Sequence, residues 1–244
     1  MALIRRVFWP DTHTPFHDKL AVKIALELIK DFKPQEIVIL GDFFDCYSVS
    51  QYDKDPLKCF NLLEDELVEG RELLSEIERV SKCKSVVFLE GNHEARIAKY
   101  INVYASKLGG TLSVREVLKI PKHYRYFPYG QSGHYRFANF IATHGSIANQ
   151  HSCASMVKKY GANVIFGHVH QLQEYHVRNI HGDDFAAYSC GWLGDMERAA
   201  EYVKNFGNWT QGLGLGYSTS RRTFMQLVPI INHEAVLNGE IYGK

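Results

Sequence analysis

The feature that most constrains this chain is a series of short apolar runs that each end in a cluster of Asp, Asn or His. The runs and their clusters are Leu3–Trp9 before Asp11-Thr12-His13, Ile37–Leu40 before GDFFD, Val86–Leu89 before GNHE, Phe140–Thr143 before HG, and Val164–Phe166 before GHVH. Short apolar runs of this kind are typical of buried strands, and glycine lets the backbone turn sharply off a strand. Because the carboxyl ends of strands in an open α/β sheet form the ligand-binding crevice, we expect the clusters to converge there.

Helical patterns lie between the runs. The expected strands are Leu3–Trp9, Ile37–Leu40, Ser85–Leu89, Asn139–Thr143 and Asn163–Phe166, and the expected helices are Lys19–Phe32, Leu57–Val80 and Cys153–Tyr160. Such alternation predicts an α/β fold around a largely buried sheet. Four further strands are expected at Glu174–Ile180, Phe185–Cys190, Gly212–Tyr217 and Thr223–Ile231, and we assign them to a second sheet. With no repeat and no linker, residues 1–244 are expected to form one domain.

Composition excludes several classes of protein. The chain has 45% hydrophobic and 23% charged residues, as ordinary globular proteins do. Its net charge of +1 indicates no general attraction to nucleic acid or to a membrane. The apolar runs are too short to span a bilayer, and the N-terminus lacks the apolar core of a secretion signal. Five cysteines without a CxxC indicate neither a disulfide framework nor a cysteine zinc site, so we predict a cytoplasmic protein.

Positive charge is concentrated in residues 95–136. Eight Lys or Arg residues stand there against a single acid, and six tyrosines are interleaved with them. We expect this segment to form a basic, tyrosine-rich helical cap that overhangs the site. Two interpretations remain open: a cap that follows a phosphate backbone and stacks bases on tyrosines, or a solvated cap with tyrosines packed beneath it.

The clusters contain more mixed oxygen and nitrogen ligands than one metal ion requires. The candidates are Asp11, His13, Asp42, Asn92, His144, His168 and His170. Such a set suits two divalent ions that share a bridging carboxylate, as in sites for displacement at phosphorus. Imidazole with carboxylate favours Mn, with Fe, Zn, Ni or Mg as alternatives. The histidines outside the motifs are expected to be scaffold: His123, His134, His176, His181 and His233.

The order of the motifs, DxH, GDxxD, GNH(E/D), HG and GHxH, resembles that of the calcineurin-like metallophosphoesterases from Asp11 to His170. The resemblance implies a two-sheet β-sandwich flanked by helices, a four-layer αββα arrangement with a dimetal site at one edge of the sheets. It also implies a hydrolase that acts on ester bonds by means of a metal-activated water.

The resemblance implies a role for each motif residue. The first metal would be held by Asp11, His13 and His170, the second by Asn92, His144 and His168, and Asp42 would bridge the two. His93 matches the family's non-ligand catalytic histidine, which would protonate the leaving group, and Asp45 matches the acid that pairs with it. Asn92 and Arg96 are placed to contact the substrate.

Two departures from the family narrow the substrate. Phosphoprotein phosphatases of the family carry Arg where this chain has Cys46 and Glu90. A dianionic phosphomonoester needs such cationic clamps, although Arg96 could supply one. The prediction is therefore a metal-dependent phosphodiesterase that acts on nucleotides or nucleic acid. A phosphomonoesterase of the same family is the first alternative, and a non-catalytic nucleic-acid-binding scaffold is the second.

Overall fold

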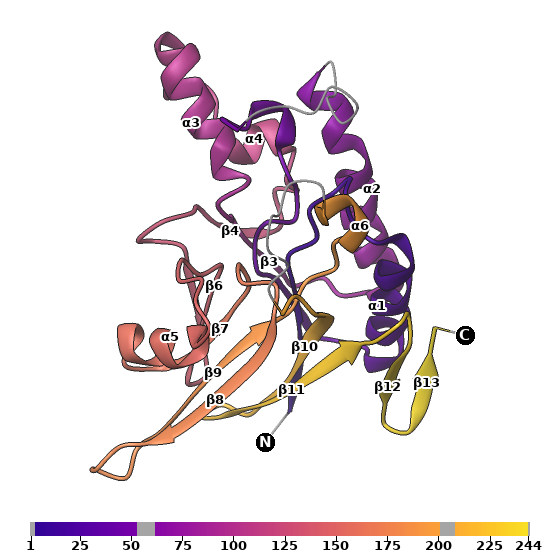
Figure 1. The fold of residues 1–244 in the computed structure, drawn as a ribbon, viewed down its shortest axis with the longest axis vertical. Helices are drawn as coiled ribbons and strands as arrows, with labels where there is room; N and C mark the ends of the chain where they lie inside the picture. Colours follow the sequence, from indigo (N-terminus) through magenta and orange to yellow (C-terminus); the bar gives the residue numbers. More distant parts are fainter. Residues whose placement is uncertain (1–2, 53–61, 201–207, 244) are drawn as a thin grey trace.

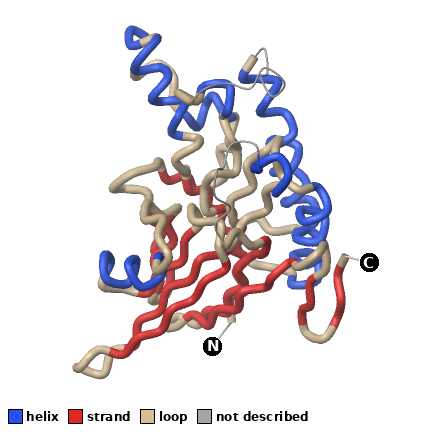
Figure 2. Tube along the Cα trace, in the orientation of Figure 1, coloured by secondary structure: helices blue, strands red, loops and turns tan. Residues whose placement is uncertain are grey.

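The computed structural model describes residues 3–52, 62–200 and 208–243 (Figure 1). Two β-sheets lie face to face, and helices cover their outer surfaces (Figure 2). The helices are α1 (Lys19–Phe32), α2 (Leu63–Ser81), α3 (Ala95–Tyr104), α4 (Val114–Leu118), α5 (Ser152–Tyr160) and α6 (Met196–Ala200), with short 3-10 turns at Tyr47–Val49 and Ser106–Leu108. A hairpin of β12 (Ala235–Leu237) and β13 (Glu240–Tyr242) precedes the C-terminus.

The first sheet has the strand order β11-β10-β1-β2-β3-β4. Its strands are β1 (Ile4–Trp9), β2 (Glu36–Ile39), β3 (Val86–Leu89), β4 (Arg125–Phe127), β10 (Gln211–Ser218) and β11 (Thr223–Ile230). Strands β1 to β4 run parallel, so their carboxyl ends share one edge, while β10 and β11 are antiparallel additions beyond β1.

The second sheet has the order β5-β6-β7-β9-β8. Its strands are β5 (His134–Phe137), β6 (Phe140–Thr143), β7 (Asn163–Phe166), β8 (Leu172–Arg178) and β9 (Asp184–Cys190). Strands β6, β7 and β9 run parallel. The three parallel strands therefore also present their carboxyl ends at one edge.

Alternation along the strands produces the layers. In β1, Val7 and Trp9 pack with α1 and α2, whereas Phe8 packs against the second sheet. In β7, Ile165 joins the layer between the sheets, while Val164 and Phe166 pack under α5. Successive side chains of a strand point to opposite faces, so the central strands of both sheets are buried on both sides. The predicted αββα sandwich is confirmed, with α1 and α2 on one side and α5 on the other (Figure 1).

Local signals set the bounds of α1, which match the prediction. The Asp18 carboxylate accepts hydrogen bonds from the backbone N–H groups of Leu20 and Ala21, as an N-cap does. Lys33 ends the helix in the left-handed conformation, immediately before Pro34. Helix α2 begins at Leu63 in the described structure, and the first residues predicted for this helix, 57–61, lie outside the described residues.

One sheet assignment was wrong. The four C-terminal strands do not form a second sheet: β8 and β9 extend β6 and β7, whereas β10 and β11 extend β1. Gly214 of β10 explains the close fit, since a Cβ there would lie 2.7 Å from the sulfur of Cys190 across the sandwich. This distribution depends on packing between the sheets, which strand patterns do not encode.

The predicted helical cap over 95–136 is also corrected. Its helical part ends at Leu118, and the remainder supplies β4 and β5, one strand to each sheet. Tyr126 and Phe127 alternate between the two faces of the first sheet, which is a strand pattern. Helix α3 projects from the body of the protein (Figure 1). Within the described residues, no helix is long and apolar enough to cross a membrane.

Candidate active site

The predicted metal ligands meet where the parallel strands of both sheets end. The loops after β1, β2, β3, β6 and β7 carry them. Two groups have ligand atoms that all lie within 4.8 Å of one another: Asp11, His13, Asp42 and His170, and then Asp42, His144 and His168. Asn92 joins the second group, because its Oδ1 lies 2.9 Å from Nε2 of His144 and 2.8 Å from Nδ1 of His168. Asp42 belongs to both groups, which is the position of a bridging carboxylate.

Backbone contacts bind the loops of the two sheets together. The N–H of His168 donates to Oδ2 of Asp11 over 2.8 Å, and the N–H of His93 donates to Oδ1 of Asp42 over the same distance. Two glycines permit this approach: a Cβ at Gly167 would lie 2.1 Å from Oδ1 of Asp11. A Cβ at Gly91 would lie 2.2 Å from Oδ1 of Asp42. Glycine is therefore required at both positions, because any other side chain would collide with a carboxylate oxygen of Asp11 or Asp42.

Four ligand residues have a left-handed backbone: φ is 54° at His13, 47° at Asp42, 69° at His168 and 57° at His170. Residues other than glycine rarely adopt this conformation, which costs about 1 kcal/mol or more each. Such strain persists where the surrounding structure imposes it, and it concentrates at functional sites. The rest of the fold therefore holds these side chains in place.

The donor set fits metal binding atom by atom. His144 donates from Nδ1 to the carbonyl oxygen of Leu40 over 2.9 Å, which turns Nε2 toward Asp42, 3.3 Å from Oδ2. His13 contacts Asp45 through Nδ1 at 3.0 Å, and its Nε2 lies 3.0 Å from Nε2 of His170. Metal-binding histidines usually anchor their second nitrogen in this way. Oδ1 of Asp11 is buried without a hydrogen-bond partner, as a ligand oxygen awaiting a cation would be.

The electrostatics also favour cations at this place. Burial alone raises the pKa of Asp42, but the rings of His144 and His93 lower it well below its usual range. Burial lowers the pKa of His144, and Asp42 more than reverses this, to about 10. Burial, followed by repulsion from His144, lowers the pKa of His168 to about 4, so that ring is neutral, the state in which imidazole binds metals.

His93, Asp45 and Arg96 form a second cluster beside the ligands. Nδ1 of His93 lies 3.2 Å from Oδ2 of Asp45, as the prediction of a paired acid requires. The same oxygen also contacts His13, so Asp45 serves two rings. Nη1 of Arg96 donates to Oδ1 of Asp45 over 3.2 Å, and Nη2 lies 3.0 Å from Nε2 of His93. Burial alone lowers the pKa of His93, but Asp42 and Asp45 raise it above its usual value.

Glu94 has a part in the site that the sequence analysis did not assign. Its buried carboxylate accepts hydrogen bonds from three backbone N–H groups, those of Asp42 (3.0 Å), Phe44 (2.8 Å) and Gly91 (2.8 Å). It thereby joins the loops after β2 and β3 on which Asp42 and Asn92 stand. The signal was present, because Glu94 is the last residue of GNHE.

Two tryptophans pack on His170. The ring of Trp192 stacks on it at 5.0 Å between centroids and 13° between planes, and Trp209 meets it edge-on at 4.4 Å. These contacts fix the orientation of a candidate ligand ring. No local motif marks either tryptophan, since each comes from a loop far from His170 in sequence.

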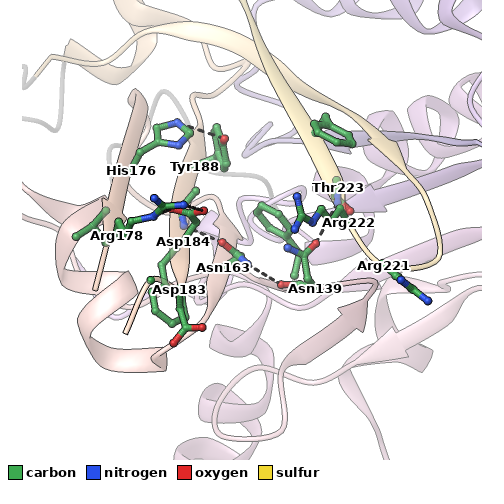
Figure 3. A pocket seen from close by; sticks show the side chains of 16 residues that line it. Asn139, Asn163, His176, Arg178, Asp183, Asp184, Tyr188, Arg221, Arg222 and Thr223 are labelled. Carbon is green, nitrogen blue, oxygen red and sulfur yellow. Dashed lines mark hydrogen bonds and ion pairs between the residues drawn. The ribbon is translucent and has the colours of Figure 1, made fainter. Parts of the chain in front are cut away.

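A separate cavity of about 890 Å³ lies at the other end of the sandwich (Figure 3). It is bordered by the starts of β6, β7 and β9 and by the β10–β11 turn, and it contains none of the predicted site residues. Arg178 there is engaged by Asp184 through two hydrogen bonds, of 2.9 and 3.1 Å. The convergent metal ligands, and not this larger cavity, mark the candidate active site.

An α/β sandwich with ligands for two ions at its edge is the architecture of a metal-dependent phosphoesterase. The family model described as calcineurin-like phosphoesterase matches residues 5–172, and the chain belongs to this family. The family is one of phosphoesterase hydrolases that typically use dinuclear metal sites, and this chain has candidate ligand groups for such a site.

Related sequences match this chain over nearly its whole length. The Gene 54 proteins of the Mycobacterium phages L5 and D29 are each 26% identical over 255 residues, covering 98% of both chains. Among solved structures, a single mutant of Vps29 from Entamoeba histolytica matches with a TM-score of 0.51 and 12% identity, covering 96% of each chain. Vps29 from Cryptosporidium parvum matches with a TM-score of 0.50 and 11% identity, covering 99% of each. The structural likenesses show a shared fold.

Proposed function

We propose that this protein is a metal-dependent phosphodiesterase that acts on nucleotides or nucleic acid. The observation that carries the proposal is the pair of ligand groups that share Asp42, placed directly beside the His93–Asp45 pair. Two divalent ions, Mn²⁺ by preference, would be held by the groups assigned above. When bound, they would supply a water activated for attack and a clamp on the phosphate oxygens.

The charge around the site supports a diester over a monoester. Cys46 and Glu90, where the phosphatases carry Arg, are both buried. Glu90 accepts a hydrogen bond from the hydroxyl of Tyr126 over 2.6 Å and adds negative charge to that side of the site. Arg96 reaches the site, but Asp45 already engages it. A singly charged phosphodiester suits such a site better than a dianionic monoester.

The residues of this chain divide the proton chemistry between them. Asp45 accepts from Nδ1 of His93 and so directs Nε2 toward the ligand cluster, where Oδ2 of Asp42 lies 3.8 Å away. A protonated Nε2 would donate its proton to the leaving oxygen. Protonation would also end the contact between Nε2 and Arg96, because both groups would then be donors. Nη2 of Arg96 could then turn to a phosphate oxygen, while Nη1 would keep its hydrogen bonds to Asp45.

The basic segment adds less to substrate binding than its charge suggests. Lys119 pairs with Glu64 at 2.6 Å, and Arg125 pairs with Glu36 at the amino ends of the strands, away from the site. Arg96 and Lys99, at the start of α3, line the cleft. We therefore propose that contact with a nucleic-acid backbone is confined to this first turn of α3.

The decisive experiment compares Mn²⁺-supported hydrolysis of bis(p-nitrophenyl) phosphate with that of p-nitrophenyl phosphate. We expect the diester to have the higher kcat/KM. Faster cleavage of the monoester would favour the phosphomonoesterase. Hydrolysis of neither ester by protein that holds two Mn²⁺ ions would favour the scaffold. We also infer a reducing cytoplasm as the location, which the buried free thiols of Cys46, Cys83, Cys153 and Cys190 support.

A further inference from the structure

Two cavities border the candidate active site, and Tyr129 is common to the linings of both. The Arg96 cavity, of about 540 Å³, is lined by Asn92, Arg96 and Lys99 among others. The Tyr160 cavity, of about 360 Å³, is lined by His144, His134 and Tyr160 among others. A substrate centred on the ligand cluster could therefore extend in two directions.

We propose that the Tyr160 cavity binds a nucleoside that stays attached to phosphorus during cleavage, while the leaving alcohol occupies the Arg96 cavity. This inference rests on the proposed phosphodiesterase function. It adds a binding site for the nucleoside. It also assigns the orientation of the substrate, that is, which of the two ester groups leaves and which stays on phosphorus. A phosphomonoester has one organic group and would use one cavity.

The direction follows from the position of the candidate general acid. His93 must lie next to the leaving oxygen, and it contacts Arg96 at 3.0 Å. Asn92 and Arg96, which flank it in sequence and in space, line the Arg96 cavity. The leaving oxygen is therefore on that side. The other ester group must point away from His93, and of the two cavities the Tyr160 cavity is the one that neither Asn92 nor Arg96 lines; His144 lines it.

The walls of the Tyr160 cavity fit an aromatic base. The ring of Tyr129 lies 5.9 Å from that of His144, and the ring of Tyr160 lies 5.3 Å from that of His134, so two aromatic pairs line the cavity. A hydrogen bond of 2.9 Å between Nε2 of His134 and the hydroxyl of Tyr160 fixes the second pair. Preformed aromatic surfaces bind bases by stacking, with little dependence on base identity.

One cation stands at this cavity as well. Nζ of Lys159 donates to Oγ of Ser146 over 2.8 Å and lies 5.6 Å from the centroid of the Tyr160 ring. An ammonium group beside the ring on which a base stacks could form an ion pair with a further phosphate attached to the bound nucleoside, as in a nucleic-acid strand. The volume is at the lower end of the range of small-ligand sites, roughly 300–1,000 Å³, so a single nucleoside is the unit that we assign to it.

The experiment uses two diesters that have the same leaving group. In the p-nitrophenyl ester of thymidine 5′-phosphate the retained group is a nucleoside, and in ethyl p-nitrophenyl phosphate it is an alkyl chain. With the Mn²⁺-loaded protein we expect kcat/KM for the thymidyl ester to exceed that for the ethyl ester by about tenfold or more, from base stacking. Tyr160→Leu should remove most of that ratio, and Tyr160→Phe should keep it.

A matched control is Tyr175→Leu, which alters a half-exposed tyrosine of β8 outside both cavities. It should leave the ratio as in the wild type. A second measurement needs no metal and no turnover: saturation-transfer NMR of thymidine with the metal-free protein should show contact of the base protons, and Tyr160→Leu should abolish the signal.

The possible failures are distinguishable. Equal kcat/KM for the two esters in the wild type, or an unchanged ratio in Tyr160→Leu, would overturn the nucleoside subsite and leave the phosphodiesterase in place. Absence of hydrolysis of both esters would overturn the proposed function and this inference together. A thymidine signal that persists in Tyr160→Leu would show that the base binds elsewhere and would also refute the subsite.

Discussion

Replacement of Glu94 by Gln tests whether this buried carboxylate holds the metal ligands in place. One oxygen, Oε2, accepts from the N–H groups of Asp42 and Gly91, and the other, Oε1, accepts from that of Phe44. A glutamine can keep the first two bonds through its amide oxygen. Its NH₂ group would then face the N–H of Phe44, donor against donor.

The expected loss of Mn²⁺ affinity in Glu94→Gln follows from that single unsatisfied donor. Loss of a hydrogen bond to a charged acceptor, with a buried donor left unsatisfied, costs about 1.5–3 kcal/mol. Because the loop carries Asp42, part of this cost should appear as a shift of the bridging ligand. Changes in groups that orient metal ligands typically reduce metal affinity by about 10- to 100-fold. We expect a loss of this size in the affinity of Glu94→Gln for Mn²⁺.

The assay is calorimetric titration of the metal-free protein with Mn²⁺, and circular dichroism verifies the fold of each variant. Glu90→Gln is the matched control, because Glu90 is also a buried carboxylate of the same loop but binds the hydroxyl of Tyr126. It should bind Mn²⁺ much more tightly than Glu94→Gln does, since it alters a charge near the site but no hydrogen bond to the loop that carries Asp42. Equal affinity in Glu94→Gln and Glu90→Gln would refute the role assigned to Glu94.

Three further predictions concern catalysis, the close approach at the site and acid stability. His93→Ala should lower turnover by about 10²–10⁴ with both metals retained, and by less for esters of good leaving groups. Gly167→Ala should displace Asp11, since its Cβ would lie 2.1 Å from Oδ1, and metal analysis should show loss of one ion. Burial alone raises the pKa of Glu36, but Arg6 above all lowers it below its usual value of 4.5. The stability that ionised Glu36 contributes should therefore be complete above pH 4.5 and be lost as the pH falls through the lower folded pKa. Urea unfolding at several pH values, with the free energy of unfolding of the wild type compared with that of Glu36→Gln, measures this contribution.

Each of these outcomes has a clear opposite. An empty second metal site in His93→Ala would make His93 a ligand. Two ions bound normally in Gly167→Ala would show that the site tolerates a Cβ at this position. If the difference in unfolding free energy between wild type and Glu36→Gln stayed constant from pH 7 to pH 3, the ion-pair account of Glu36 would be wrong.

Much of the candidate site could be predicted because its signals are local. Each ligand follows its strand within a few residues, and parallel strands deliver their ends to one edge. Thus Asp11, Asp42 and His144 could be placed together from sequence alone. The bounds of helix Lys19–Phe32 match the prediction, and in the structure the Asp18 N-cap and the following Pro34 mark its two ends.

The tertiary structure alone decided what depends on contacts between distant segments. The position of β10 beside β1, the stacking of Trp192 on His170 and the pairing of Arg125 with Glu36 all join residues far apart in the chain. The pattern of a strand indicates which of its two faces is buried, but not which other strand or helix packs against that face. For the same reason the charge count of residues 95–136 left two interpretations open, since it could not show which cations, such as Arg125, have acidic partners.

The sequence by itself therefore determined the make-up of the candidate site: the types of candidate ligand, their order and the strand ends on which they stand. The tertiary structure decided how that site is held and what surrounds it, from the three bonds of Glu94 to the two cavities that Tyr129 lines. The physical reason is the distance along the chain between the residues that interact. Turns and strand ends follow from neighbouring residues, whereas the shape of a cleft follows from the packing of two sheets whose contacts are mostly between distant residues.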